Sequence, residues 1–401
     1  MPYHTPDASA FTRIKRIDVS QTANSNSTHK VGIISPYNIY FPLFRSVKLP
    51  VNKLISNKFI TSTDSSTSGP ILSTYSLLLG SGTNVYKITY INDTFTTLGT
   101  IPTIGVYATY NITNVKDTST YLIDGRSYYS KMAISTNNGV TWNLVGNNIP
   151  SGTINSSYII GSTWYALNVS RLYRSTNSGS TWSQVAYFAP SFSSEFLFVR
   201  GTNFIVLGSR LLWTSTDGTT FTDRNSSVGN AQYSFCSPLY YNGTYYLFGR
   251  DYDSNRNFRL TTTDLATFSR TNLPATTYKI LGIRRNPTTG LLVGLIGVTS
   301  AGTDAGIKWS SDDGLTWTDA TGSVANKYIT LASSFGVGTS ITYYSKFLRF
   351  TGSVFVTTMS DKTLHYSTDG KIWNVLSNYP TPPATDLFSI GVQYNDETGQ
   401  Y

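Results

Sequence analysis

The chain has 401 residues, of which 39% are apolar and only 13% are charged, and its formal net charge is +9. The single cysteine, Cys236, excludes an internal disulfide, and no apolar run is long enough for a membrane-spanning helix. The apolar share excludes a disordered chain, so we expect a globular protein with Cys236 buried in its core.

Residues 1–68 are predicted to form a basic, partly extended arm. Through residue 60 this segment holds eight lysines and arginines against two aspartates, a net charge of +6. The stretch from Ile33 to Phe44 is too apolar for a free tail, so we expect it to dock on the rest of the chain or on a neighbouring protein. The cations are too sparse for a nucleic-acid arm, and Pro36 and Pro42 disfavour an amphipathic membrane helix.

The first residues also carry a resemblance. The segment Thr5–Thr12, followed by Lys15, resembles the N-termini of some structural proteins of large DNA viruses. The resemblance implies that the arm attaches the chain to other structural proteins of a particle. No signal peptide is visible ahead of it.

Residues 69–401 repeat one short turn six times, and its clearest copy is Ser310–Trp317, Ser-Ser-Asp-Asp-Gly-Leu-Thr-Trp. A short Asp or Asn side chain accepts backbone N–H groups two or three residues on, and Gly at the tip permits a positive φ. We expect the aromatic residue to enter the next strand and bury a large apolar area. These box turns pair an acceptor with an aromatic residue: Asn137 and Trp142, Asn177 and Trp182, Asp217 and Phe221, Asp264 and Phe268, Asp312 and Trp317, Asp369 and Trp373.

The box turn resembles the Asp-box of sialidase-like β-propellers. The same unit occurs in xyloglucan-cleaving glycosidases, sortilin-type receptors and a photosystem assembly factor. The resemblance implies that each turn joins the third and fourth strands of a blade, on the rim away from the usual active site. The predicted role of every copy is therefore structural.

The acceptors recur at intervals of 40, 40, 47, 48 and 57 residues, which suits blades of four strands. In one period strands are predicted at 154–160, 164–169, 172–175 and 181–187. In the next they are predicted at 195–200, 204–208, 211–215 and 220–224. No helix is predicted.

The two ends of the repeat region are predicted to share one blade. Residues 71–98 contain three strands, and residues 92–95 have the pattern of a degenerate box turn. The strand from Leu387 repeats the pattern of Lys279–Gly290, because both place Asn-x-x-Thr-Gly after an apolar strand. We therefore predict an all-β, seven-bladed propeller, closed by pairing the C-terminal strand with the first N-terminal blade.

Three arginines and one glutamate on predicted innermost strands are candidate binding residues. Glu195 begins such a strand five residues before Arg200, a placement that resembles a catalytic carboxylate. The alternative is an exposed charge at a strand start. Arg284 and Arg285 lie on another innermost strand, and period-two alternation would aim only one of them at the channel.

Asp251 and Asp253 are candidates of a different kind. They lie in a loop with Arg250, Tyr252 and Arg256, which is either a sugar- or ion-binding cluster or a polar loop. The three histidines are scattered without zinc-ligand spacing, and no phosphate-binding glycine loop or nucleophile elbow is present. No metal or cofactor is predicted.

The sequence favours a non-enzymatic structural or interaction module. Its surface is rich in Tyr, Asn, Ser and Thr rather than ions, as is common in virion and extracellular proteins. We expect the arm to anchor the chain and the propeller to present loops to a protein or glycan. The alternatives are a glycoside hydrolase of the sialidase or xyloglucanase kind, and an intracellular assembly factor.

Overall fold

In the computed structural model the chain divides into two compact units, Met1–Thr67 and Ser68–Tyr401. All described residues belong to the second unit and lie between 77 and 391. Residues left out within that span are 82–83, 90–93, 101–108, 115–119, 126–131, 138, 146–148, 150–153, 161, 189–193, 230–232, 237, 276–277, 299–305, 328, 331–346, 360 and 377–388.

The described residues of the second unit form seven sheets of four or five strands. The first is β3 (Thr94–Thr100), β2 (Asn84–Thr89), β1 (Leu77–Ser81) and β31 (Ser389–Gly391). The second is β4 (Thr109–Asn114), β5 (Tyr121–Gly125), β6 (Met132–Ser135) and β7 (Asn143–Val145). The third is β8 (Ile154–Ile160), β9 (Thr163–Asn168), β10 (Arg171–Ser175) and β11 (Ser183–Tyr187). The fourth is β12 (Ser194–Arg200), β13 (Asn203–Gly208), β14 (Leu211–Ser215) and β15 (Thr222–Asp223).

The remaining three sheets have a fifth strand. The fifth sheet has β16 (Tyr233–Phe235) and β17 (Leu239–Tyr241) both pairing β18 (Thr244–Asp251), followed by β19 (Arg256–Thr262) and β20 (Ser269–Ala275). The sixth has β21 (Lys279–Arg285), β22 (Leu292–Val298), β23 (Gly306–Ser310), β24 (Thr318–Asp319) and β26 (Ile329–Thr330). The seventh has β27 (Leu348–Phe350), β28 (Phe355–Thr358), β29 (Leu364–Ser367), β30 (Ile372–Val375) and β25 (Thr321–Gly322).

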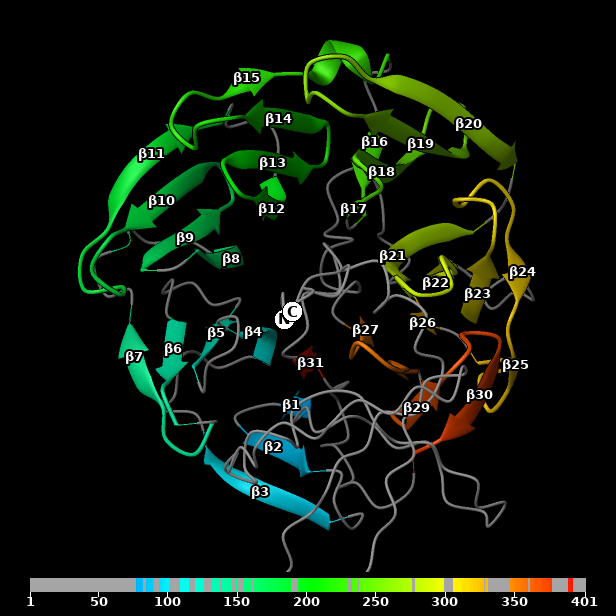
Figure 1. The fold of residues 1–401 in the computed structure, drawn as a ribbon, viewed down its shortest axis with the longest axis horizontal. Coiled ribbons are helices and arrows are strands. Elements are labelled where there is room, and N and C mark those ends of the chain that lie inside the picture. Colours follow the sequence, from blue (N-terminus) through cyan, green and yellow to red (C-terminus); the bar gives the residue numbers. More distant parts are fainter. Residues whose placement is uncertain are drawn as a thin grey trace, which may run out of the picture. The chain divides into compact units, whose positions relative to one another are not determined.

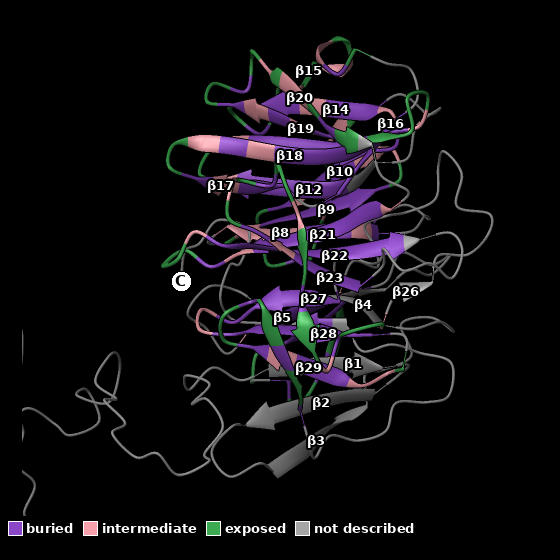
Figure 2. Cartoon of the chain, turned by 90° about the vertical axis from the view of Figure 1, so that its right-hand side faces the viewer, coloured by how far each residue is buried: buried purple, intermediate pink, exposed green. Residues whose placement is uncertain are grey.

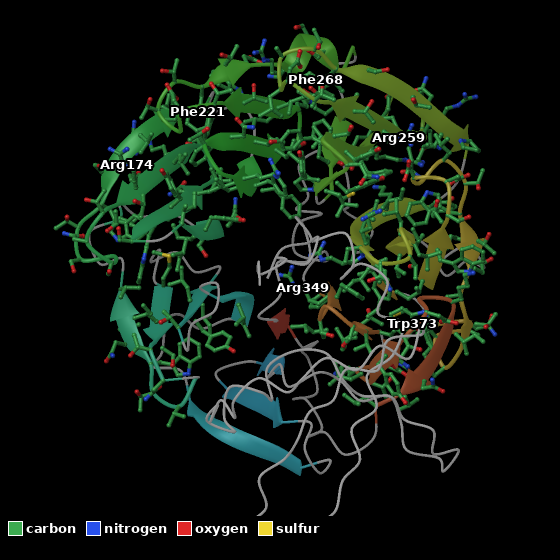
Figure 3. The ribbon with its side chains drawn as sticks, in the orientation of Figure 1. Arg174, Phe221, Arg259, Phe268, Arg349 and Trp373 are labelled. Carbon is green, nitrogen blue, oxygen red and sulfur yellow. The ribbon has the colours of Figure 1, made fainter. Side chains whose placement is uncertain are left out.

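The sheets follow one another around a common centre, and β31, β4, β8, β12, β21 and β27 are the strands of their sheets nearest to it (Figure 1). β31 is the exception to chain order, because it pairs antiparallel with β1 through Leu79 and Ile390. It also neighbours both β27 and β4. Arg349 on β27, near the centre in Figure 3, donates from Nε to the Ile390 carbonyl at 3.1 Å. The ends of the repeat region are thus joined within one sheet.

The middle strands whose burial is described are largely buried on both faces, because their sheets pack between neighbouring sheets (Figure 2). In β13 all residues after Asn203 are buried, so the strand is a continuous apolar run rather than an alternating one. The outermost strand β15 is exposed instead. Cys236 is fully buried, as predicted, and burial raises the pKa of its thiol to about 12.

The box turns contain the predicted hydrogen bonds. In the turn after β23, Ser310 Oγ donates to Asp312 Oδ1 at 2.7 Å and accepts the Gly314 N–H at 2.9 Å. Asp312 Oδ1 accepts the N–H groups of Leu315 and Thr316 at 3.1 and 3.0 Å. Asn177 makes the equivalent bond without a charge, because its Oδ1 accepts the Thr181 N–H at 2.9 Å.

In five of the six box turns the aromatic residue lies just before the next strand rather than in it, which corrects one expectation, whereas Trp373 lies within β30 as expected. Trp182 Nε1 donates back to the Gly179 carbonyl at 3.0 Å, and β11 begins only at Ser183. In the same way β15 begins at Thr222, after Phe221. The ring closes its own turn, so the predicted strands 181–187 and 220–224 each begin two residues too early.

The box turn after β19 has no glycine. Leu265 stands at the tip with φ 57° and is 2% exposed. Its carbonyl accepts a hydrogen bond from Thr214 Oγ1 of the neighbouring sheet at 3.0 Å. Burial of the leucine side chain and this bond offset the cost of the left-handed backbone.

The all-β class is confirmed for the described residues. Their only helical segment is one 3-10 turn, Asn225–Ser227, so no helix among them is long and apolar enough to cross a membrane. The turn at Asn286–Gly290 is present, with Asn286 Oδ1 accepting the Thr288 N–H at 2.9 Å. The basic arm, most of the degenerate box at 92–95 and the expected hairpin at 395–399 lie outside the described residues.

Two glycine substitutions separate backbone strain from steric clash. A Cβ at Gly314 (φ +81°) would lie 2.5 Å from Phe248, whereas one at Gly243 (φ +78°) would meet nothing within 4 Å. We expect Gly243→Ala to cost about 1–2 kcal/mol for the left-handed backbone. Gly314→Ala should cost about 1–3 kcal/mol more through overpacking. Urea unfolding midpoints measure both, and equal losses would contradict the packing role of the box tip.

Candidate functional site

Arg200 and Arg285 reach one strand from two neighbouring sheets. Arg200 ends β12, and its Cζ lies 3.7 Å from the centre of the Tyr240 ring. Arg285 ends β21, and its Cζ lies 4.1 Å from the centre of the Tyr241 ring. The two tyrosines are adjacent in β17 and therefore face opposite sides of the strand, so each packs against a different neighbouring sheet.

The stack on Tyr241 continues into the fifth sheet. The rings of Tyr241 and Tyr246 are parallel, with centres 4.1 Å apart, and Arg259 lies 5.8 Å above Tyr246. Tyr241 Oη donates to Asp313 Oδ1 at 2.9 Å, and Arg259 Nη1 donates to the Asp313 carbonyl at 2.8 Å. Figure 3 shows Arg259 on this sheet. Burial and the Asp313 hydrogen bond raise the pKa of Tyr241.

These contacts place the stacked arginines at the edge of the sheets that carries the box turns. In an up-and-down sheet the turn between strands one and two lies on the same edge as the turn between strands three and four. Arg200 and Arg285 precede turns of the first kind, and Asp313 belongs to a box turn. We call this the box edge and the other the opposite edge.

Arg284 does not join Arg285. Its side chain is fully buried, and its Nη1 donates to the Ile283 carbonyl at 2.8 Å. The neighbouring Arg285 is half-buried against Tyr241. The two arginines thus separate as strand alternation requires.

Asp251 and Asp253 lie at the opposite edge, in the loop between β18 and β19. Asp251 is buried and accepts the N–H groups of Asp253 and Ser254 at 3.0 and 3.1 Å. Its Oδ2 pairs with Arg270 at 2.6 Å. Burial alone would raise the pKa of Asp251, but the bonds from Arg270 and Ser254 outweigh it and hold the pKa below its usual value. Asp253 is exposed, so the two carboxylates do not converge on one ligand position.

Two buried cations that sequence reasoning did not single out as a pair contact this loop, Arg250 from β18 and Lys279 from the start of β21. Arg250 Nη1 donates to the Tyr278 carbonyl at 3.0 Å, and Arg250 also bonds Asn255. Lys279 Nζ lies 4.8 Å from the centre of the Tyr252 ring. Burial and the nearby Arg250 lower the pKa of Lys279 to about 8.

Glu195 lies in β12 at an irregularity of the strand. The pairing of β12 with β13 shifts register between Ser194 and Phe196, a β-bulge or a related irregularity at Glu195 that also occurs near the start of β4, β8 and β21. Bulges re-aim side chains and are frequent beside active sites. The orientation of the Glu195 side chain lies outside what the structure describes.

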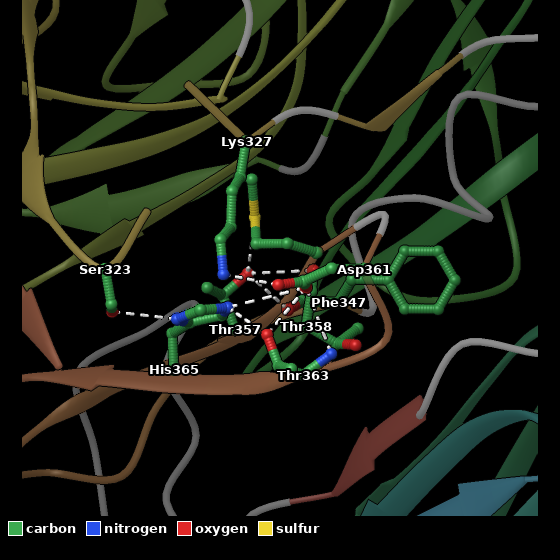
Figure 4. A network of polar contacts seen from close by, with 9 residues as sticks. Ser323, Lys327, Phe347, Thr357, Thr358, Asp361, Thr363 and His365 are labelled. Carbon is green, nitrogen blue, oxygen red and sulfur yellow. Dashed lines mark hydrogen bonds and ion pairs between the residues drawn. The ribbon is translucent and has the colours of Figure 1, made fainter. Parts of the chain in front are cut away.

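A histidine network that the sequence did not indicate lies in the seventh sheet (Figure 4). His365, on β29, is fully buried, and its Nδ1 lies 2.8 Å from Ser323 Oγ. Its Nε2 bonds Thr363 Oγ1, which donates to Asp361 Oδ1 at 2.6 Å. Asp361 in turn pairs with Lys327. Because Thr363 uses its proton on Asp361, His365 donates from Nε2 and accepts from Ser323 at Nδ1.

The order serine, histidine, aspartate resembles a nucleophilic triad, but the surroundings do not suit one. Asp361 lies 3.6 Å from His365 and is already paired with Lys327. A nucleophilic serine also needs backbone N–H groups free to bind an oxyanion. The Ser323 N–H instead donates to the Trp373 carbonyl at 2.8 Å. The network instead ties the segment Thr321–Lys327, which leaves the sixth sheet, to the seventh.

Most described carboxylates are committed to the fold. Asp253 is set aside here. Every other aspartate whose side chain is described accepts a hydrogen bond or pairs with a cation: Asp217, Asp223, Asp251, Asp264, Asp312, Asp313, Asp319, Asp361 and Asp369. Across the described part of the chain no group of three His, Cys, Asp or Glu side chains is arranged to hold a metal ion.

Solved structures resemble the fold at low sequence identity. The GH74 xyloglucanase of Xanthomonas campestris matches with a TM-score of 0.53 and 13% identity, over 81% of this chain and 53% of that one. YCF48 bound to a D1 peptide gives 0.48 and 14%, over 69% and 83%. A chain of a nidogen–laminin complex gives 0.44 and 10%, over 79% and 97%.

These neighbours are β-propeller proteins, and the fold of this chain is a β-propeller. The xyloglucanase match supports the fold alone at such identity, and this chain spans about half of that enzyme. A scan against protein-family models finds no match, and neither does a search of curated protein sequences.

The histidine network predicts a pH-dependent stability. Burial, reinforced by Lys327, lowers the pKa of His365, so the folded state holds the imidazole neutral more strongly than the unfolded chain does. The folded state is then fully favoured above the unfolded pKa of about 6.5 and loses stability as pH falls below it, because the unfolded chain binds the extra proton.

The matched variant is His365→Gln, which removes the titrating group at a cost of about 1 kcal/mol for a lost hydrogen bond. We expect the drop in the urea midpoint between pH 7.5 and pH 5 to shrink in this variant. An unchanged drop would show that the network is not the source of the pH dependence.

Proposed function

We propose that the chain is a non-catalytic binding module, and the observation that carries this is the use of its carboxylates. A glycoside hydrolase needs two carboxylates held at a defined separation around the scissile bond. The described aspartates instead close turns or pair with cations, and Asp251 and Asp253 do not converge. The side chains that do converge from different sheets are arginines and tyrosines.

The partner is proposed to be a protein or a glycan presented to the propeller loops. The surface chemistry supports this, because hydroxyls, amides and aromatic faces outnumber ions in the sequence. The same composition is the basis for proposing a virion or another extracellular surface as the site of action. A hydrolase is the second candidate, and its support is the placement of Glu195 near the start of the innermost strand β12.

The arm, residues 1–68, is proposed to attach the chain to other structural proteins of a particle. Its support is the concentration of charge, since residues 1–60 carry a net +6 of the chain's +9. A surface with complementary negative charge would steer and orient such an attachment.

Catalysis is tested with the full chain and a set of aryl glycosides, sialosides and xyloglucan oligosaccharides. We expect no turnover above the buffer rate, measured by chromatography of the products. Glu195→Gln is the matched control, because loss of a general acid or nucleophile lowers a true enzymatic rate by about 100-fold or more. Turnover that falls in this way would make the protein a hydrolase.

Attachment is tested by replacing the cations of the arm with glutamine in the full chain: Arg13, Lys15, Arg16, Lys30, Arg45, Lys48, Lys53 and Lys58. We expect this arm-neutral variant to lose co-sedimentation with the parent assembly while the unfolding midpoint of the propeller stays unchanged. Undiminished co-sedimentation would show that the cations of the arm are not needed for attachment, and would place the attachment surface on the propeller.

A further inference from the structure

Three consecutive turns at the box edge carry polar but uncharged side chains beside the stacked arginines. The exposed carboxylate of Asp313, which is bonded to Tyr241, belongs to a box turn on the same edge. The exposed and half-exposed residues of the turns after β12, β17 and β21 are Gly201, Thr202, Asn203, Asn242, Gly243, Thr244, Pro287, Thr288, Thr289 and Gly290. None carries a charge or a large apolar side chain. The exposed large hydrophobic residues of the described chain lie elsewhere, as at Leu144, Tyr187 and Ile372.

Arg200 and Arg285 supply the positive charge of this surface. Among the described carboxylates none pairs with either guanidinium. Each guanidinium carbon instead lies over the ring of a tyrosine. By contrast, Arg259 on the same stack donates to a backbone carbonyl, as a purely structural arginine does.

A guanidinium fixed by stacking presents its N–H groups in one plane at its edge. That fork matches a carboxylate or a sulfate, which accept two parallel hydrogen bonds from it. Stacking removes much of the rotamer freedom that an arginine otherwise loses on binding, so the two forks are pre-organised. Inter-sheet packing accounts for the tyrosine contacts, but it does not require two cations without counter-ions.

The character of the surrounding residues distinguishes between two kinds of anionic partner. Protein interfaces depend on buried apolar or aromatic anchors surrounded by a polar rim. Here the exposed residues of the three turns carry hydroxyls or amides or are glycines, apart from Pro287, and Tyr240 and Tyr246 are half-buried within the stacks. Hydroxyl and amide groups with ring edges and spaced cationic forks are suited to a saccharide that carries oxyanions.

We propose that the box edge around the β17–β18 hairpin binds an anionic polysaccharide, whose carboxylate or sulfate groups are held by Arg200 and Arg285. This deepens the proposed binding role and rests on it. The site lies on the edge that carries the box turns, and its two forks come from different sheets around a single strand, β17. A polymer crossing the hairpin therefore meets one fork on each side.

Binding is measured in the arm-neutral full chain, because the basic arm would itself attract polyanions. The probes are a heparin-type oligosaccharide, which carries sulfates, and an oligogalacturonate, which carries only carboxylates. We expect Arg200→Gln and Arg285→Gln each to weaken binding at least tenfold. Arg256→Gln removes the same charge at the opposite edge and should change binding less than twofold. Binding of either probe with this pattern supports the site, and the preferred probe identifies the oxyanion.

Arg200→Lys keeps the charge but loses the planar fork, and it is expected to weaken binding nearly as much as glutamine. If a glutamine variant fails to fold, this variant and hydrogen exchange of residues 239–246 with and without probe decide the case. Equal weakening by Arg256→Gln, absence of binding by both probes, or stronger binding of oligoglutamate than of either sugar would overturn the proposal. Recovery of shortened probe would instead overturn the non-catalytic function.

Discussion

One side-chain oxygen fixes the corner of each box-bearing blade. Oδ1 of the Asp or Asn accepts backbone N–H groups while the neighbouring hydroxyl donates to it, as at Asp217, where the N–H bonds are 2.8 and 2.7 Å long. These bonds hold the pKa of Asp217 below its usual range. The corner then sets the start of the outermost strand, and the aromatic residue closes the turn from its other side. Because Asn137 and Asn177 use the same oxygen without a charge, the acceptor and not the ion is the constraint.

This constraint also shapes what the surface can do. Acidic side chains are few, and the fold uses nearly all the described ones to close turns or neutralise buried cations. Arg200 and Arg285 pair with no described carboxylate. They lie at the inner end of the box edge, where tyrosines of the β17–β18 hairpin pack against them. At its described positions such a propeller has few free carboxylates for acid–base chemistry, and it has arginines that can bind anions.

The sequence was informative where the interactions are local. The box turn is closed within eight residues, so its hydrogen bonds, its repeat length and the all-β class follow from residue types alone. Strand alternation likewise predicted that Arg284 and Arg285 face opposite sides of the strand. It did not predict which of the two is buried. The contacts of the candidate site are not local. Arg200 meets Tyr240, and Ser323 meets His365 42 residues later, and such pairings between sheets leave no periodic signal. The aspartates of the β18–β19 loop were a polar loop rather than a ligand cluster because Arg270, on the next strand but one, neutralises Asp251.

The most direct measurement is hydrogen exchange of the amides of Leu315 and Thr316 in three forms of the full chain: wild type, Asp312→Asn and Asp312→Ala. If the oxygen is what fixes the corner, the asparagine form keeps the slow exchange of both amides and the alanine form loses it. Equally fast exchange in the asparagine and alanine forms would show that the charge holds the turn. Slow exchange in all three would show that the surrounding strands hold the turn without the side chain.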